Sequence, residues 1–139
     1  MLPSVWGKHG WNFLHLTLLS YPKNPTDEDK QNYKEYITSL QKVLPCNKCR
    51  NHMKAHLQKH PLDDAALSSR DSIVKWGIDL HNIVNYHTGK RMLTYSEAIN
   101  EINKLAKVKD QEKPFLLFVV MLMVVIMMIL TYQYVKRHW

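Results

Sequence analysis

Cysteine is scarce in this sequence, which has only two among its 139 residues, Cys46 and Cys49. Two cysteines cannot build the disulfide framework that stabilises many small secreted domains. A signal peptide is not expected either, because Lys8, His9 and Asn12 interrupt any apolar run near the N-terminus. A C-x-x-C pair in such a chain indicates redox chemistry or a metal site.

Alternation of polar and apolar residues, typical of strands, does not persist beyond a few positions, whereas helical spacing of apolar residues recurs along the chain. The helical segments cover residues 5–20, 26–44, 46–59, 70–87 and, in a shorter fifth helix, 94–106. Pro45 should end the second segment. In the first segment the expected apolar face holds Trp6, Phe13, Leu14, Leu16 and Leu18. The predicted fold is all-α, a four-helix bundle plus a short fifth helix.

Local signals mark where these helices begin and end. Thr26 with Asp29 is a candidate capping box for the second helix, and Thr94 with Glu97 is one for the fifth. Gly89 stands where a glycine cap would end the fourth helix.

A long apolar run, which begins at Phe115 and reaches Val135 without a charge, follows the helical segments. About 20 helical residues cross the roughly 30 Å hydrocarbon layer of a bilayer, and a buried core helix would normally keep a polar edge. We therefore predict a folded domain over 1–106, a charged linker over 107–113, a C-terminal transmembrane helix over 114–135 and a basic tail over 136–139. Such a chain is tail-anchored.

Basic residues outnumber acidic ones, 19 to 12, and give a net charge of +7. The lysines that precede the apolar run place the folded domain on the cytosolic side of a membrane by the positive-inside rule. A positive balance also suits nucleic acid. The other basic residues are scattered, however, so no nucleic-acid partner is expected.

The C-x-x-C pair suits thiol chemistry. Cys46 follows Pro45 at a helix start, where unpaired backbone N–H groups favour a thiolate, and Lys48 and Arg50 add positive charge. Cys46 and Cys49 lie on neighbouring turns and can close a disulfide.

Zinc is one alternative, because His52 and His56 extend the pair to C-x-x-C-x-x-H-x-x-x-H. Four side chains spread along one helix cannot converge tetrahedrally, so no metal is predicted and both histidines are expected in solvent. A thioredoxin-like site is the other alternative, but it requires a strand before the pair.

Three segments stand out in this order: W-G-K-H-G-W at 6–11 followed by Leu14 and His15, P-C-N-K-C at 45–49, and L-H-N-I-V-N at 80–85 followed by Gly89 and Lys90. Together they resemble the Erv/ALR family of FAD-linked sulfhydryl oxidases. The resemblance extends from about residue 5 to residue 106. It implies a four-helix bundle that holds FAD with its ring against the redox disulfide.

The resemblance also implies roles for individual residues. Cys46 matches the cysteine that an incoming substrate thiol attacks, and Cys49 matches the one nearer the flavin. The residues that match cofactor contacts are Gly7, Lys8, Trp11, His15, Tyr21, Trp76, His81, Asn82, Val84, Asn85 and Lys90. Tryptophan rings can stack on a flavin or an adenine, and lysines can meet a pyrophosphate.

The activity implied is the formation of disulfides in partner proteins, with electrons passing through FAD to oxygen to give hydrogen peroxide. The chain lacks the second, shuttle C-x-x-C of many members, and Ile78 stands where a structural cysteine often lies. The expected partner is therefore a protein dithiol or a thioredoxin-like relay protein, and a homodimer is also implied.

Minimal members of this kind resemble those of large cytoplasmic DNA viruses, which implies a virion membrane or the endoplasmic reticulum of an infected cell. The alternative is a tail-anchored helical adaptor with a metal-binding C-x-x-C.

Overall fold

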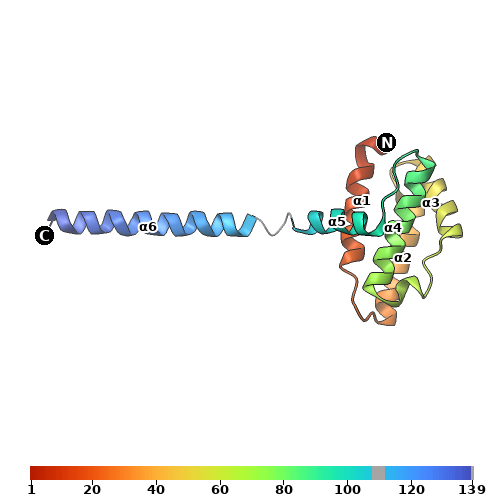
Figure 1. Ribbon diagram of the computed structural model, residues 1–139, viewed down its shortest axis with the longest axis horizontal. Coiled ribbons are helices and arrows are strands. Elements are labelled where there is room, and N and C mark those ends of the chain that lie inside the picture. The colour runs from red at the N-terminus through yellow and green to blue at the C-terminus, as the bar shows by residue number, and fades with distance from the viewer. Residues whose placement is uncertain (108–111, 139) are drawn as a thin grey trace. The chain divides into compact units, whose positions relative to one another are not determined.

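The computed structural model describes residues 1–107 and 112–138, and all regular structure within these ranges is helical (Figure 1). The predicted all-α class is confirmed. The elements are α1 (Pro3–Leu19), α2 (Asp27–Val43), α3 (Asn47–Lys59), the short 3₁₀ helix η1 (Ala66–Ser68), α4 (Arg70–His87), α5 (Tyr95–Lys107) and α6 (Glu112–His138). The chain forms two compact units, one over residues 1–102 and one that begins at Asn103.

Both predicted capping boxes are present. The Thr26 hydroxyl accepts a hydrogen bond from Asp29 N, and the Asp29 carboxylate accepts one from Thr26 N at 2.8 Å, so two of the backbone N–H groups left free at the start of α2 are paired. Thr94 and Glu97 make the same reciprocal pair at the start of α5. Local sequence therefore determines where both helices begin.

The end of α4 is a Schellman motif, as the position of Gly89 predicted. Lys90 N donates to Asn85 O at 2.8 Å, and Gly89 N donates to Tyr86 O at 3.2 Å. Gly89 has a φ of +66°, a backbone conformation that is unfavourable for residues with a side chain. The motif turns the chain directly into the segment that leads to α5.

The core of the first unit forms where α1 packs on α4 and α2 packs on α3. Gly77 allows the first of these contacts, because a Cβ atom there would lie 2.3 Å from Leu18 Cδ1. The side chains with the least exposure come from all parts of the bundle: Leu18, Tyr21, Ile37, Leu67, Ile73 and Leu80.

The expected apolar face of α1 was partly wrong. Phe13 is 63 % exposed and Leu16 is 37 % exposed, whereas Leu14, His15 and Leu18 are buried. Apolar residues surround most of this helix, so their spacing alone could not identify the buried side.

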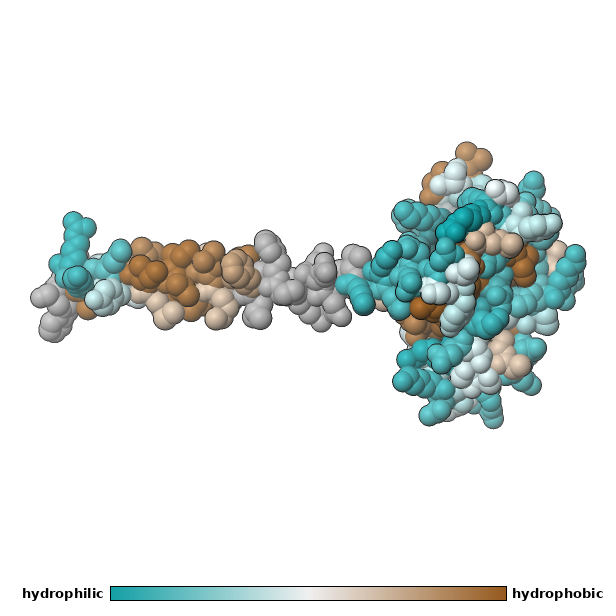
Figure 2. All heavy atoms as spheres, in the orientation of Figure 1, coloured by the Kyte–Doolittle hydropathy of each residue, from teal (hydrophilic) through white to brown (hydrophobic). Residues whose placement is uncertain are grey.

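The apolar helix α6 belongs to the second unit. One stretch of it, Phe118–Arg137, is long and apolar enough to cross a membrane, and none of it is buried. Hydrophobic residues cover most of its coloured part in Figure 2, and hydrophilic residues lie at its C-terminal end. The predicted linker over 107–113 falls largely outside the described residues.

Candidate functional site

The Cys46–Cys49 disulfide lies at the start of α3. The two Cα atoms are 5.1 Å apart. Cys46 is the N-cap residue of the helix, and its Sγ accepts a hydrogen bond from Cys49 N at 3.2 Å. Both cysteines are partly exposed, so a thiol from solvent has access to this end of the helix.

Arg50 braces the turn in front of the disulfide. Its guanidinium donates to Leu44 O at 2.5 Å and also to the Asn47 side chain. The amino group of Met1 donates to Pro45 O at 3.1 Å, so the start of α1 lies against the same turn. Arg50 therefore fixes the backbone around the cysteines. The sequence did not reveal this role, because the partners of Arg50 are a backbone carbonyl and a side-chain amide and not an acidic residue.

Three aromatic side chains from α1 and α4 form a ring cluster, which consists of Trp11, His15 and His81. The Trp11 and His81 rings stack with centroids 3.9 Å apart and planes 8° apart. The His15 ring lies 5.9 Å from Trp11, and His15 Nε2 is 2.9 Å from His81 Nδ1. Residues separated by 66 positions in the chain thus meet where the sequence predicted cofactor contacts.

The ring cluster has unused hydrogen-bonding capacity. Burial lowers the pKa of His15 to about 4 and is the main reason why the pKa of His81 is also about 4, so both rings are neutral at pH 7. His15 Nδ1 is buried and has no hydrogen-bond partner within the described ranges. Buried polar atoms normally have a partner. A flat, hydrogen-bonding ligand such as a nucleotide base or a flavin would fit both features.

The other predicted cofactor contacts lie at different depths around this cluster. Gly7 faces open space, since no atom lies within 4 Å of a Cβ built there. Lys8 and Lys90 are exposed, Val84 is half-buried and Asn85 is buried. One helical turn after His81, Asn85 shares its face of α4. Gly7 thus has no side chain that could block a ligand, and the two exposed lysines could meet a negatively charged group of one.

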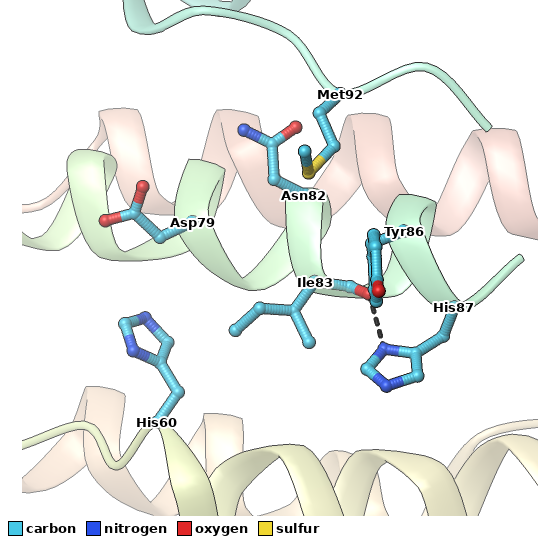
Figure 3. Close-up of a pocket in the computed structure, with 7 residues that line it drawn as sticks. All are labelled: His60, Asp79, Asn82, Ile83, Tyr86, His87 and Met92. Carbon is cyan, nitrogen blue, oxygen red and sulfur yellow. Dashed lines mark hydrogen bonds between the residues drawn. The ribbon is translucent and has the colours of Figure 1, made fainter. Parts of the chain in front are cut away.

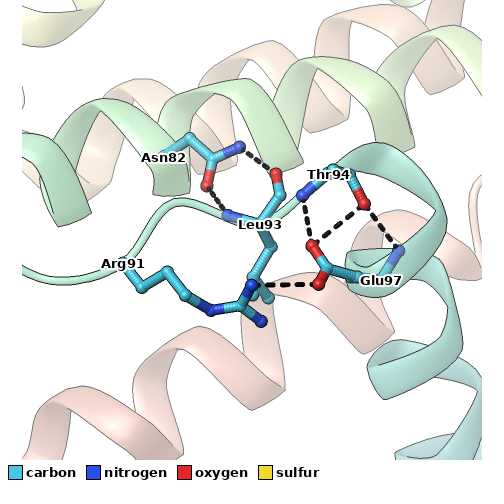
Figure 4. A network of polar contacts seen from close by, with 5 residues as sticks. All are labelled: Asn82, Arg91, Leu93, Thr94 and Glu97. Carbon is cyan, nitrogen blue, oxygen red and sulfur yellow. Dashed lines mark hydrogen bonds and ion pairs between the residues drawn. The ribbon is translucent and has the colours of Figure 1, made fainter.

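Asn82 has a different role from its neighbours. Its Nδ2 donates to Leu93 O at 2.8 Å, and its Oδ1 accepts from Leu93 N at 2.9 Å (Figure 4). Arg91 and Thr94, on either side of Leu93, both bond to Glu97. Asn82 therefore holds the segment between α4 and α5 to the bundle.

Two of the predicted contacts, Tyr21 and Trp76, are core residues. The Tyr21 hydroxyl donates to Leu67 O at 2.9 Å, and Trp76 Nε1 donates to Pro61 O at 3.1 Å. The His60 ring stacks on Trp76 with centroids 5.6 Å apart. Their polar atoms are thus already satisfied within the chain.

A pocket that the sequence did not indicate lies between α3 and α4 (Figure 3). It is an open pocket of about 460 Å³ lined by His60, Asp79, Asn82, Ile83, Tyr86, His87 and Met92. Asp79, Ile83 and Tyr86 project from the face of α4 opposite to His81. The pocket is therefore separate from the ring cluster.

The prediction that both α3 histidines lie in solvent was wrong for one of them. His52 is exposed, but His56 is 8 % exposed and its ring centroid lies 5.0 Å from that of His87. Burial lowers the pKa of His56, with His87 adding to the effect. No three or more His, Cys, Asp or Glu side chains in the described part of the chain are placed to hold a metal ion.

Comparisons with known proteins identify relatives of this chain. The Erv1/Alr family model matches residues 8–111. A probable FAD-linked sulfhydryl oxidase, R368 of Acanthamoeba polyphaga mimivirus, is 56% identical over 104 residues, which cover 75% of this chain and 73% of that protein. A putative FAD-linked sulfhydryl oxidase of Invertebrate iridescent virus 6 is 34% identical, over 69% of this chain and 90% of that one.

Solved structures show the same fold. The FAD binding domain of Erv1 from Saccharomyces cerevisiae superposes with a TM-score of 0.63 at 25% identity, over 77% of this chain and 92% of that one. The yeast Erv1 core superposes with a TM-score of 0.59 at 26% identity, over 73% and 77% of the two chains. The resemblance seen in the sequence is thus confirmed, and the chain belongs to the Erv1/Alr family.

Proposed function

We propose that this protein is an FAD-dependent thiol oxidase that forms disulfide bonds in other proteins. The observation that carries the proposal is the Cys46–Cys49 disulfide at the exposed start of α3, in a chain of the Erv1/Alr family. The names of its relatives, which are FAD-linked sulfhydryl oxidases, support the same activity.

The cysteines carry out the first half of the reaction by thiol–disulfide exchange. A substrate thiolate attacks Cys46 Sγ, the bond between the two cysteines breaks, and Cys49 leaves as a thiolate. The second substrate thiolate then attacks the mixed disulfide and releases Cys46. The substrate leaves with a disulfide, and its two electrons remain on the cysteine pair.

The start of α3 assists both departures. Cys46 caps the helix, so a thiolate there accepts the Cys49 N–H and lies at the positive end of the helix dipole. Arg50 keeps the turn in place while the sulfurs exchange partners.

The ring cluster would hold the cofactor. Trp11 and His81 offer stacking surfaces, and His15 Nδ1 offers a buried hydrogen-bonding atom. Gly7, Lys8, Val84, Asn85 and Lys90 surround them as further contacts. Bound FAD would supply a two-electron acceptor for the cysteine pair that oxygen can reoxidise, with hydrogen peroxide as the product.

The setting of the reaction is part of the proposal. Because Cys46 and Cys49 are the only cysteines in the sequence, the dithiol must come from a substrate protein or from a thioredoxin-like relay protein. The helix α6 serves as a membrane anchor, and the lysines before it favour a domain that faces the cytosol, at a virion or endoplasmic reticulum membrane. A homodimer is included because the family resemblance implies it.

The visible absorption spectrum tests this proposal. The purified chain should show a flavin band at about 450 nm that bleaches with dithiothreitol and returns in air. Cys46→Ser and Cys49→Ser should keep the band and lose thiol oxidation. A colourless protein that contains one zinc ion per chain would refute the oxidase and favour the metal-binding adaptor.

A further inference from the structure

Acidic residues are absent from two long stretches of the first unit. None occurs before Asp27, and none occurs between Glu35 and Asp63. The second stretch contains both cysteines. Its basic residues are Lys42, Lys48, Arg50, Lys54 and Lys59.

These stretches meet at one end of the bundle, which we call the redox end. Met1 N bonds to Pro45 O, so the start of α1 adjoins the turn between α2 and α3 that carries Cys46. The opposite end is fixed by Arg70, at the start of α4, whose Nε donates to Tyr21 O just after α1. Half of the acidic residues lie at or next to that opposite end: Asp27, Glu28, Asp29, Asp63, Asp64 and Asp71.

The bundle is therefore polarised along its length. Each long helix has about 17 residues and spans roughly 25 Å, which is more than two Debye lengths at physiological salt. The acidic end consequently does not neutralise the redox end. A charged partner experiences two different fields at the two ends.

The lysines near the disulfide are available to a partner. Lys42, Lys48 and Lys54 are all exposed. The ion pairs that join Lys30 to Asp27, Lys75 to Asp79 and Arg91 to Glu97 use none of them. Positive charge without a carboxylate partner is costly to assemble and gains most from an external anion.

Their positions along the chain lie before, between and after the two cysteines. Lys48 lies between the two cysteines, and Lys42 is four residues before Cys46, within about 14 Å along the chain. Lys54 lies about 12 Å further along α3 from Cys46. All three thus lie within one Debye length of the disulfide at low salt, where that length reaches about 30 Å.

From this arrangement we infer that the redox end docks protein segments whose cysteines are flanked by Asp and Glu. The inference rests on the proposed function and adds the chemistry of its substrate. An acidic segment is drawn to Lys42, Lys48 and Lys54 and repelled by the opposite end, which orients its thiols towards Cys46. A protein segment is favoured over an anionic lipid surface because the disulfide, whose reaction partner is a thiol, lies within the group of lysines.

Three peptides test this docking on the full chain, loaded with FAD in a neutral detergent. The peptides share one C-x-x-C pair and differ in four flanking residues, which are all Glu, all Gln or all Lys. At low salt the kcat/KM for the Glu peptide should exceed that for the Lys peptide by roughly tenfold, with the Gln peptide between them. In about 0.5 M salt the difference should fall below about twofold.

Charge reversal on the enzyme gives the matched test. Lys54→Glu should lower the rate with the Glu peptide about threefold and raise the rate with the Lys peptide, and Lys42→Glu combined with it should enlarge both effects. Lys23→Glu is the control, because this exposed lysine follows α1 at the opposite end of the bundle. It should change neither rate by more than about 1.5-fold.

Dithiothreitol separates the two proposals, because it is uncharged and reports oxidation without docking. If dithiothreitol is oxidised normally but the three peptides react equally, the docking proposal is wrong and the oxidase stands. If dithiothreitol is not oxidised, both are wrong. If the peptides react equally and Lys54→Glu instead weakens binding to phosphatidylserine vesicles, the lysines serve a lipid surface and the proposal is overturned.

Discussion

Asn82→Ala is the most informative substitution in this chain. The side chain makes two hydrogen bonds to the backbone of Leu93, at 2.8 and 2.9 Å, and thereby holds the segment that leads into α5. The family resemblance instead matched Asn82 to a cofactor contact. The two roles predict different effects on the protein without FAD.

The size of the effect follows from these bonds. Each neutral hydrogen bond contributes about 1 kcal/mol net, so the loss of both should lower the free energy of unfolding by about 2 kcal/mol. Leu93 is only half-buried, so water can partly replace the amide and the loss should not exceed this value. With a urea m value of roughly 1.5 kcal/mol/M, the midpoint should fall by about 1.3 M.

Urea unfolding followed by tryptophan fluorescence measures this change, because Trp6, Trp11 and Trp76 lie in the first unit. The melts are compared with and without saturating FAD. If Asn82 holds the segment before α5, the substitution lowers the urea midpoint in both melts. If Asn82 contacts the cofactor, the midpoint falls only when FAD is present, because weaker FAD binding stabilises the folded chain less.

Asn32→Ala is the control, because Asn32 is exposed in the middle of α2. This variant should change the free energy of unfolding by less than about 0.5 kcal/mol. If Asn82→Ala without FAD behaves like this control, Asn82 does not hold the segment between α4 and α5, and the reasoning is refuted.

Three further predictions concern stability. The pKa of His15 and of His81 lies near 4 in the folded chain against 6.5 when unfolded, so the unfolded chain binds more protons between these values. Stability should therefore fall as the pH drops from 6.5 to 4, and His15→Gln should flatten this dependence in urea melts at a series of pH values. Gly89→Ala should cost about 1 kcal/mol, because φ is +66° and no atom blocks the added Cβ; a neutral result in a thermal melt would contradict the strain argument. Thr26→Ala should cost about 1 kcal/mol through loss of the capping box, and Asp29→Ala should show a comparable loss if both reciprocal bonds matter.

Features that depend on neighbouring residues could be predicted from the sequence. The capping boxes, the Schellman glycine and the helical start of the cysteine pair each involve residues within six positions of one another. Their geometry follows from backbone hydrogen bonding, which the local sequence determines. The resemblance to a known family added what no local rule gives, namely the expectation that Trp11, His15 and His81 serve one site, and the structure brings their rings together.

Features that depend on distant partners could not be predicted. Asn82 binds Leu93 in the segment after α4, where the sequence has no periodic pattern of apolar residues. His56 is buried because α4 lies against it. Tyr21 is held by the carbonyl of Leu67, 46 positions away. In each case the residue type fits several roles, and only the packing of the helices selects one.

The cap of α3 gives the disulfide a second significance. Because Cys46 Sγ accepts the Cys49 N–H, the same sulfur caps the start of α3 and takes part in thiol–disulfide exchange. A thiolate is a stronger acceptor for this N–H than a disulfide sulfur, so α3 is better capped after the pair has been reduced. By thermodynamic linkage, whatever stabilises the reduced form makes the oxidised form a stronger oxidant. The folding energy of one helix thus contributes to the driving force with which this protein withdraws electrons from its substrates.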